Sequence, residues 1–198
     1  MEKDKQEGTA KTIPELPQGF AWKDMAFCRG TIPMPQDWHF RQDPMGPLTR
    51  IFFITREAIT GPPLVLTPGA LFVPEDTRGF FQTGLTIYVH RDAVQAFKAK
   101  PSELVNQFAR EFDLHIPESD PTISQEGNLL VVRIFFRSRE KSPLGISSPP
   151  TKLYIETSGN DSTGTFYMMT FETPSDKWSN DQEIARVMIE NRVFAQDF

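Results

Sequence analysis

The chain has 198 residues, a net charge of −5 and a pI near 5.3, with 17 Phe and 17 Pro. This length favours one domain with a tail or long loops, and the acidic balance argues against a general nucleic-acid binder. The single cysteine, Cys28, excludes an intrachain disulfide and a cysteine-based zinc site. No run of about 18 apolar residues predicts a transmembrane segment.

Residues 1–18 are polar and contain Pro14 and Pro17. We expect a flexible tail here, followed by a single domain over residues 19–198. Read as it stands, a charged start without an apolar signal core predicts a cytoplasmic protein. The same start is also typical of the tether left after removal of a signal peptide or lipid anchor, so an extracytoplasmic, membrane-tethered protein remains open.

Short strands are expected after the tail, at residues 20–25, 27–32, 38–42 and 50–56, where apolar runs are broken by Pro and Asp. Residues 57–83 form a Gly- and Pro-rich loop that is too long for an ordinary connection, and such loops are often functional. The strand at 84–90 then alternates, which places Leu85, Ile87 and Val89 on a core face.

A helix is expected at 101–113, because Pro101 suits a first turn and apolar residues recur every three or four positions after it. The longest strand is predicted at 129–138. After a second loop at 139–151, a hairpin joins 152–157 to 165–172. A last helix should begin at Asn180, with Glu183 completing a capping box.

This order of elements predicts an α+β fold, an α/β/α sandwich in which helices pack against a central antiparallel β-sheet. The segment from Phe27 to Trp38, FCRGTIPMPQDW, resembles the opening signature of the PsbP-like superfamily. Residues 84–89 with the helix at 101–113, and residues 178–194, are similar to that family's strand, first helix and closing helix. The family includes extrinsic subunits of the oxygen-evolving complex and a Ran-binding import factor. The resemblance therefore implies a non-enzymatic binding or assembly role.

Candidate catalytic groups are few: Cys28, His39, His90 and His115. Cys28 is expected to be a small buried hydrophobe, and the histidines are expected to be structural. A divalent cation held by Asp37, His39 and Asp43 is the enzymatic alternative. No phosphate-loop, dinucleotide or metalloprotease motif occurs, so the sequence predicts no cofactor.

Two surfaces are candidate binding sites. Phe72, Phe80 and Phe81, with Arg78 to orient a partner, lie in the loop at 57–83 and either plug the sheet edge or anchor a protein partner. Arg133 and Arg137 share one strand face and could attract an anion, or belong to a solvated face of mixed charge.

The sequence thus favours a non-enzymatic protein-binding or assembly module. A carrier of a lipophilic or anionic small molecule, with a groove between the sheet and the helix at 101–113, is the second hypothesis. A weak metal-dependent enzyme is the third.

Overall fold

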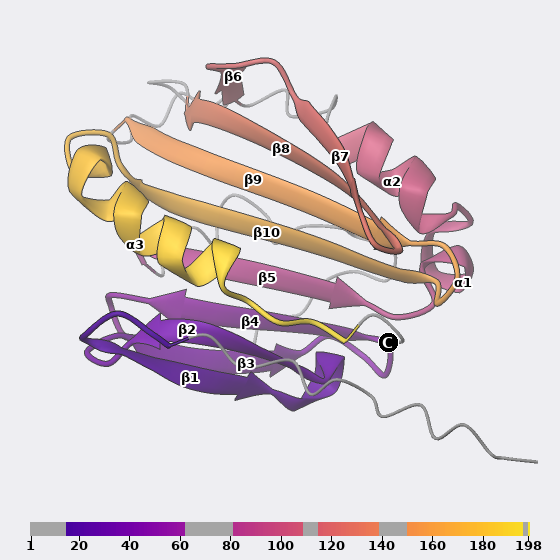
Figure 1. Ribbon diagram of the computed structural model, residues 1–198, viewed down its shortest axis with the longest axis horizontal. Coiled ribbons are helices and arrows are strands. Elements are labelled where there is room, and N and C mark those ends of the chain that lie inside the picture. The colour runs from indigo at the N-terminus through magenta and orange to yellow at the C-terminus, as the bar shows by residue number, and fades with distance from the viewer. Residues whose placement is uncertain (1–14, 62–80, 109–114, 139–149, 196–197) are drawn as a thin grey trace, which may run out of the picture.

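The computed structural model describes residues 15–61, 81–108, 115–138, 150–195 and 198. Within these residues one antiparallel sheet of eight strands dominates (Figure 1). Its strands lie in the order β3-β4-β5-β10-β9-β8-β6, with β7 also paired to β8. They span His39–Pro44, Thr49–Thr55, Gly84–His90, Thr165–Pro174, Thr151–Asn160, Leu129–Ser138, His115–Pro117 and Thr122–Glu126, in that spatial order.

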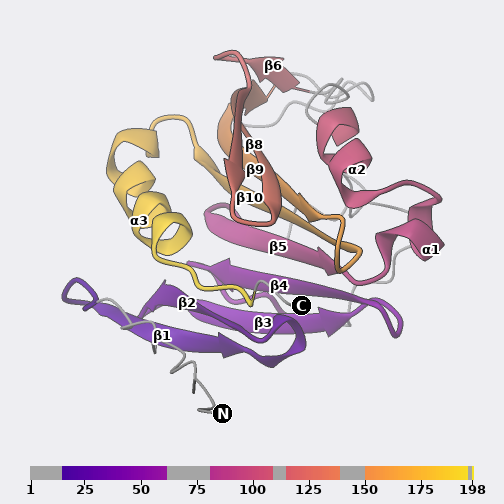
Figure 2. The same ribbon diagram turned by 45° about the vertical axis from the view of Figure 1, so that its right-hand side comes forward.

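A separate hairpin joins β1 (Phe20–Met25) to β2 (Gly30–Pro35) through the 3-10 turn η1 (Ala26–Cys28). It packs on the same face of the large sheet as helix α3 (Trp178–Glu190), which contacts β2 and β10. The two short helices α1 (Ala93–Phe97) and α2 (Pro101–Phe108) lie against the opposite face, as Figure 2 shows. The expected α+β sandwich with helices on both faces is confirmed.

The sheet separates two apolar cores. The core under α3 and the β1–β2 hairpin includes Ile87 and Met188, and the core under α2 includes Leu104 and Ile134. Every residue of β5 is buried, because this strand lies in the middle of the sheet and is covered on both sides. No helix among the described residues is long and apolar enough to cross a membrane.

Some predicted elements have the expected bounds, and others differ. β1, β5 and β8 match the predicted ranges. The strand predicted at 27–32 begins later, at Gly30, because Arg29 adopts a left-handed conformation (φ 44°) after the 3-10 turn. Helix α3 begins at Trp178, so Asn180 lies inside its first turn and the predicted capping box is wrong. Strands β6 and β7 were not expected.

The ends of the loop at 57–83 lie side by side. The Glu57 carboxylate accepts hydrogen bonds from the main-chain N–H groups of Gln82 and Thr83, each at 3.1 Å, and the Arg56 N–H donates to the Thr83 carbonyl at 2.9 Å. The interior of this loop, residues 62–80, lies outside the described residues, as do 139–149 and the end of the predicted helix at 109–114.

Candidate functional site

Of the four predicted partner-binding residues in the loop at 57–83, the structure describes one, Phe81. Phe72, Arg78 and Phe80 lie outside the described residues. Phe81 is half-buried and packs on the core under α2, with its ring 6.3 Å from that of Phe53 in an edge-to-face arrangement. At Phe81 the loop end therefore contributes to the core.

The structure places Arg133 and Arg137 on the α3 side of β8, but in different environments. Arg137 is exposed. Arg133 donates from Nε to Glu156 at 2.8 Å and from Nη2 to Glu126 at 2.6 Å. Burial lowers the pKa of Arg133, but the charges and hydrogen bonds of these two carboxylates outweigh it and hold the pKa above its usual value. The charge of Arg133 is thus already balanced within the protein.

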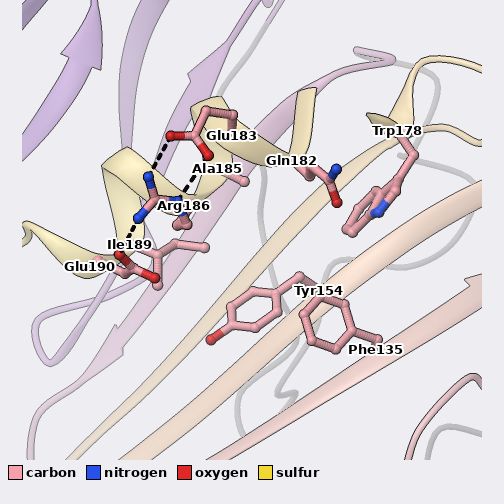
Figure 3. Close-up of a pocket in the computed structure, with 9 residues that line it drawn as sticks. All are labelled: Phe135, Tyr154, Trp178, Gln182, Glu183, Ala185, Arg186, Ile189 and Glu190. Carbon is pink, nitrogen blue, oxygen red and sulfur yellow. Dashed lines mark hydrogen bonds and ion pairs between the residues drawn. The ribbon is translucent and has the colours of Figure 1, made fainter. Parts of the chain in front are cut away.

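Between α3 and strands β8 and β9 lies a cavity of about 300 Å³ (Figure 3). A wider recess of about 780 Å³ continues from it toward the β7–β8 turn and shares four of its lining residues. We call the two together the α3 groove. The shared residues are Phe135, Tyr154, Ile189 and Glu190.

Three aromatic rings form the floor of the groove at its narrow end. The Phe135 ring lies 5.0 Å from that of Tyr154, inclined by 58°, and 6.1 Å from that of Trp178, inclined by 88°. Phe135 is 41% exposed, and it is one of three large hydrophobic residues exposed in the described part of the chain. Exposed aromatic surface in a recess is typical of a binding site.

Helix α3 forms the opposite wall. Ala185 and Ile189 face the sheet and are buried. On the outer rim, Arg186 donates to Glu183 at 2.9 Å and to Glu190 at 3.0 Å. These three side chains are more than half exposed, so the pairs contribute little to stability and line the rim with polar groups.

A buried carboxylate lies at the base of the wider recess. Glu156 is fully buried and accepts hydrogen bonds from Arg133, Arg192 and the Tyr154 hydroxyl, the last at 3.0 Å. Burial, and then the charge of Glu156, raise the pKa of Tyr154 well above its usual value. Because two guanidiniums bind the Glu156 carboxylate, it is not free to act as a general base. The cluster links β8 and β9 to the residues just after α3.

The start of α3 is held by a second buried ion pair. Asp181 accepts hydrogen bonds from Arg56 Nη2 at 2.5 Å and from Thr173 Oγ1 at 2.6 Å. Its location in the first turn of α3 also suits the positive end of the helix dipole. Because Asp181 and Arg192 anchor the two ends of α3, the position of this wall is fixed relative to the sheet.

The groove lies on the other face of the sheet from the one predicted for a ligand carrier. Helix α2 packs closely on β9: a Cβ added at Gly159 would lie 2.6 Å from the Pro101 carbonyl carbon. Leu104 and Val105 are buried in this contact.

The candidate metal ligands are not brought together. Asp43 is buried and bound by Arg41 at 2.8 and 2.9 Å, whereas His39 and Asp37 are exposed. Among the described residues there is no group of three His, Cys, Asp or Glu that could hold a metal ion.

Two of the remaining candidate catalytic groups, Cys28 and His90, are buried. Cys28 is fully buried in η1, and burial raises the pKa of its thiol to about 12. His90 is buried at the end of β5, where its Nδ1 is 3.0 Å from Thr49 Oγ1. His115 lies in β6.

The aromatic floor was not singled out from the sequence. Phe135 belongs to the face of the 129–138 strand that also carries Arg133 and Arg137. The one signal in the sequence is that Phe135 lies between two arginines on a strand face, which indicates an aromatic side chain outside the core. Tyr154 and Trp178 come from elements far from Phe135 in the sequence, and nothing in their own segments indicates that they meet it.

Comparison with known proteins gives similarity in fold. The sequence matches no family model and no curated protein sequence. Among solved structures, the cyanobacterial PsbP of Synechocystis sp. PCC 6803 is 9% identical, with a TM-score of 0.46 over 96% of this chain and 99% of that one. LpqN of Mycobacterium tuberculosis, a protein involved in cell envelope biogenesis, is 9% identical, with a TM-score of 0.43 over 84% of this chain and 83% of that one.

A Bacteroides thetaiotaomicron VPI-5482 protein is 11% identical, with a TM-score of 0.42 over 84% of this chain. This chain spans 45% of the length of that protein. These similarities identify no ligand, partner or residue role for this chain.

Proposed function

We propose that this chain is a non-enzymatic binding module and that the α3 groove holds an extended segment of a protein partner. The observation that carries this proposal is the exposed Phe135 ring, set with Tyr154 and Trp178 in a recess on the surface. A partner's apolar side chain placed on these rings would remove water from all three. Buried aromatic contacts of this kind dominate the energy of many protein interfaces.

The shape and polarity of the groove favour a peptide over a compact ligand. The groove follows α3, which at 1.5 Å per residue is roughly 20 Å long. Beyond the aromatic floor it is lined by charged and polar groups such as Glu126, Gln182 and Glu190. Such groups can accept or donate hydrogen bonds to a main chain, and the buried ion pairs beneath them keep the site preformed.

A small lipophilic ligand is the second candidate, because the narrow end alone is enclosed by three aromatic rings and has a volume of about 300 Å³. The two candidates differ in extent. A compact ligand would occupy the narrow cavity alone, whereas a peptide would also contact the charged recess around Glu126.

Phe135→Ser tests the proposal, and Ile123→Ser is its matched control. Ile123 is 60% exposed on the neighbouring strand β7, opposite Val132, and therefore lies on the α2 face of the sheet. Peptides are selected from a displayed library on the wild-type protein, and their dissociation constants are then measured for both variants. Loss of one apolar anchor worth about 2 kcal/mol should weaken binding about thirtyfold in Phe135→Ser.

Equal affinities for the wild type and Phe135→Ser would contradict the proposal. If the library yields no binder while lipophilic compounds raise the melting temperature of the wild type and not of Phe135→Ser, the carrier function replaces it. Glu126→Gln, which alters the wider recess and does not line the narrow cavity, should weaken the binding of selected peptides and leave compact ligands unchanged.

A further inference from the structure

Two arginines outside the α3 groove, Arg50 and Arg91, form no ion pair with a carboxylate of the described residues. Within the described part of the chain, Arg50 and Arg91 donate hydrogen bonds to main-chain carbonyls alone: Arg50 to Gly46 and Thr49 at 2.6 and 2.7 Å, and Arg91 to Phe27 at 2.9 Å. Five other arginines instead pair with an Asp or Glu; these are Arg41, Arg56, Arg133, Arg186 and Arg192.

The guanidinium groups of Arg50 and Arg91 both contact the aromatic ring of Phe27. The Cζ of Arg50 lies 4.6 Å from the centroid of the Phe27 ring, and the Cζ of Arg91 lies 4.5 Å from the same centroid. These distances place the two positive charges within about 9 Å of each other, close enough to repel. Figure 1 marks the C-terminus at this end of the molecule, beside the start of β4.

Both guanidiniums are held in place. The Arg91 Cζ lies 4.1 Å from the centroid of the Phe198 ring, and the Phe27 and Phe198 rings are 6.0 Å apart. Arg91 is therefore enclosed by two rings, while Arg50 is fixed by its two carbonyl acceptors. Nε and one Nη of each arginine form no hydrogen bond within the described residues, and none of these atoms is buried.

We propose that Arg50 and Arg91, beside Phe27, form a binding site for a doubly charged oxyanion of the phosphate monoester type. A phosphate monoester carries a charge of about −1.5 to −2 at pH 7, so it can balance both arginines, whereas one carboxylate balances one. The N–H edges of a guanidinium match phosphate oxygens in geometry. The held guanidiniums lower the cost of ordering on binding.

Thermal unfolding in a zwitterionic buffer tests the site, with inorganic phosphate titrated at constant ionic strength. The wild type should show a saturable rise in melting temperature. Arg50→Gln and Arg91→Gln should each weaken the apparent affinity for phosphate at least about tenfold, the loss expected for charge-assisted hydrogen bonds. Arg137→Gln, which removes an exposed arginine on the groove face, should retain the wild-type response.

A second arm distinguishes free phosphate from a lipid headgroup. Vesicles of phosphatidylcholine with and without phosphatidic acid are sedimented with the wild type and with Arg50→Gln. Response to inorganic phosphate alone assigns a soluble ligand, and Arg50-dependent sedimentation with phosphatidic acid assigns the lipid. The proposal is overturned if neither probe binds, or if the wild type and both glutamine variants respond equally.

Arg91→Gln also removes two ring contacts and could unfold the protein, so Arg50→Gln serves as the second variant. Its guanidinium lies over one ring, and its two hydrogen bonds reach an exposed turn. Circular dichroism confirms that each variant is folded before titration.

Discussion

Acid should destabilise this protein through the buried side chain of His90. His90 is 2% exposed, and its ring lies edge-to-face with that of Phe97 at 4.9 Å. Its Nε2 is buried and has no hydrogen-bond partner, while its Nδ1 lies beside the Thr49 hydroxyl. Burial lowers the pKa of His90 to about 4, because the apolar surroundings disfavour the charged imidazolium.

The sign and size of the effect follow from these two states. The folded protein keeps His90 neutral until the pH approaches 4, whereas the unfolded chain binds the proton below about pH 6.5. The stabilisation is therefore complete above pH 6.5 and is lost as the pH falls toward 4. At 1.36 kcal/mol per pH unit, the whole loss is about 3 kcal/mol, of which about 2 kcal/mol has occurred at pH 5.

Urea unfolding of the wild type and of His90→Phe, each between pH 8 and pH 4, measures this contribution. Carboxylates titrate in the same range in both proteins, so the difference between the two stabilities isolates His90. This difference should change by about 2 kcal/mol between pH 8 and pH 5 in favour of the variant. His39→Phe, at an exposed position of β3, is measured alongside as the control for replacing a histidine by phenylalanine. A pH-independent difference between His90→Phe and the wild type would refute the reasoning.

Two substitutions and one measurement of thiol reactivity test the packing on the two faces of the sheet. Gly159→Ala should lower the free energy of unfolding by about 2 kcal/mol in urea titration, because its Cβ would meet main-chain atoms of Pro101 at 2.6 and 2.7 Å; an unchanged midpoint would contradict the close packing of α2. Asp181→Asn should cost about 2 kcal/mol by the same assay, because Arg56 then loses its carboxylate partner. Cys28, fully buried and with its thiol pKa raised to about 12 by burial, should react with a disulfide reagent at pH 8 no faster than the protein unfolds.

Strands with a clear alternation of apolar side chains could be predicted from the sequence. The bounds of β5 and β8 follow from alternation of side chains that fill a core. β7 could not be found in this way, because its sequence Thr-Ile-Ser-Gln-Glu buries little surface. This strand exists through main-chain pairing with β8, and such pairing at a sheet edge leaves no hydrophobic pattern.

The start of α3 shows a local signal overruled by a tertiary contact. Asn180 and Glu183 have the spacing of a capping box, yet the helix begins two residues earlier, at Trp178. Asp181 lies in its first turn and is bound by Arg56, which is 125 residues away in the chain. A buried ion pair with that partner outweighs a solvent-exposed cap, and its partner cannot be identified from a local window of sequence.

The sequence predicts which residues of β8 share a face, but it does not predict which side chains from other elements meet them in the candidate site. Alternation along the strand puts Arg133 and Arg137 on one face, but the ion pairs of Arg133 with Glu126 and Glu156 depend on how β8 pairs with β7 and β9. The aromatic floor likewise combines Phe135 and Trp178 from remote elements. Residue types and periodicity specify which side chains leave the core, whereas the meeting of these side chains is a property of the register of the sheet.

The two helical layers differ in a way that explains why one of them carries the groove. α2 lies directly on β9, where Gly159 lets the Pro101 main chain approach. α3 packs on the other core through Met188, and ion pairs also hold its two ends, Asp181 with Arg56 and, just beyond the helix, Arg192 with Glu156. These contacts fix α3 over β10 and β2, and they leave a space beside the helix over β8 and β9. A space beside a helix fixed in this way persists without a ligand, which is the property that a preformed binding groove requires.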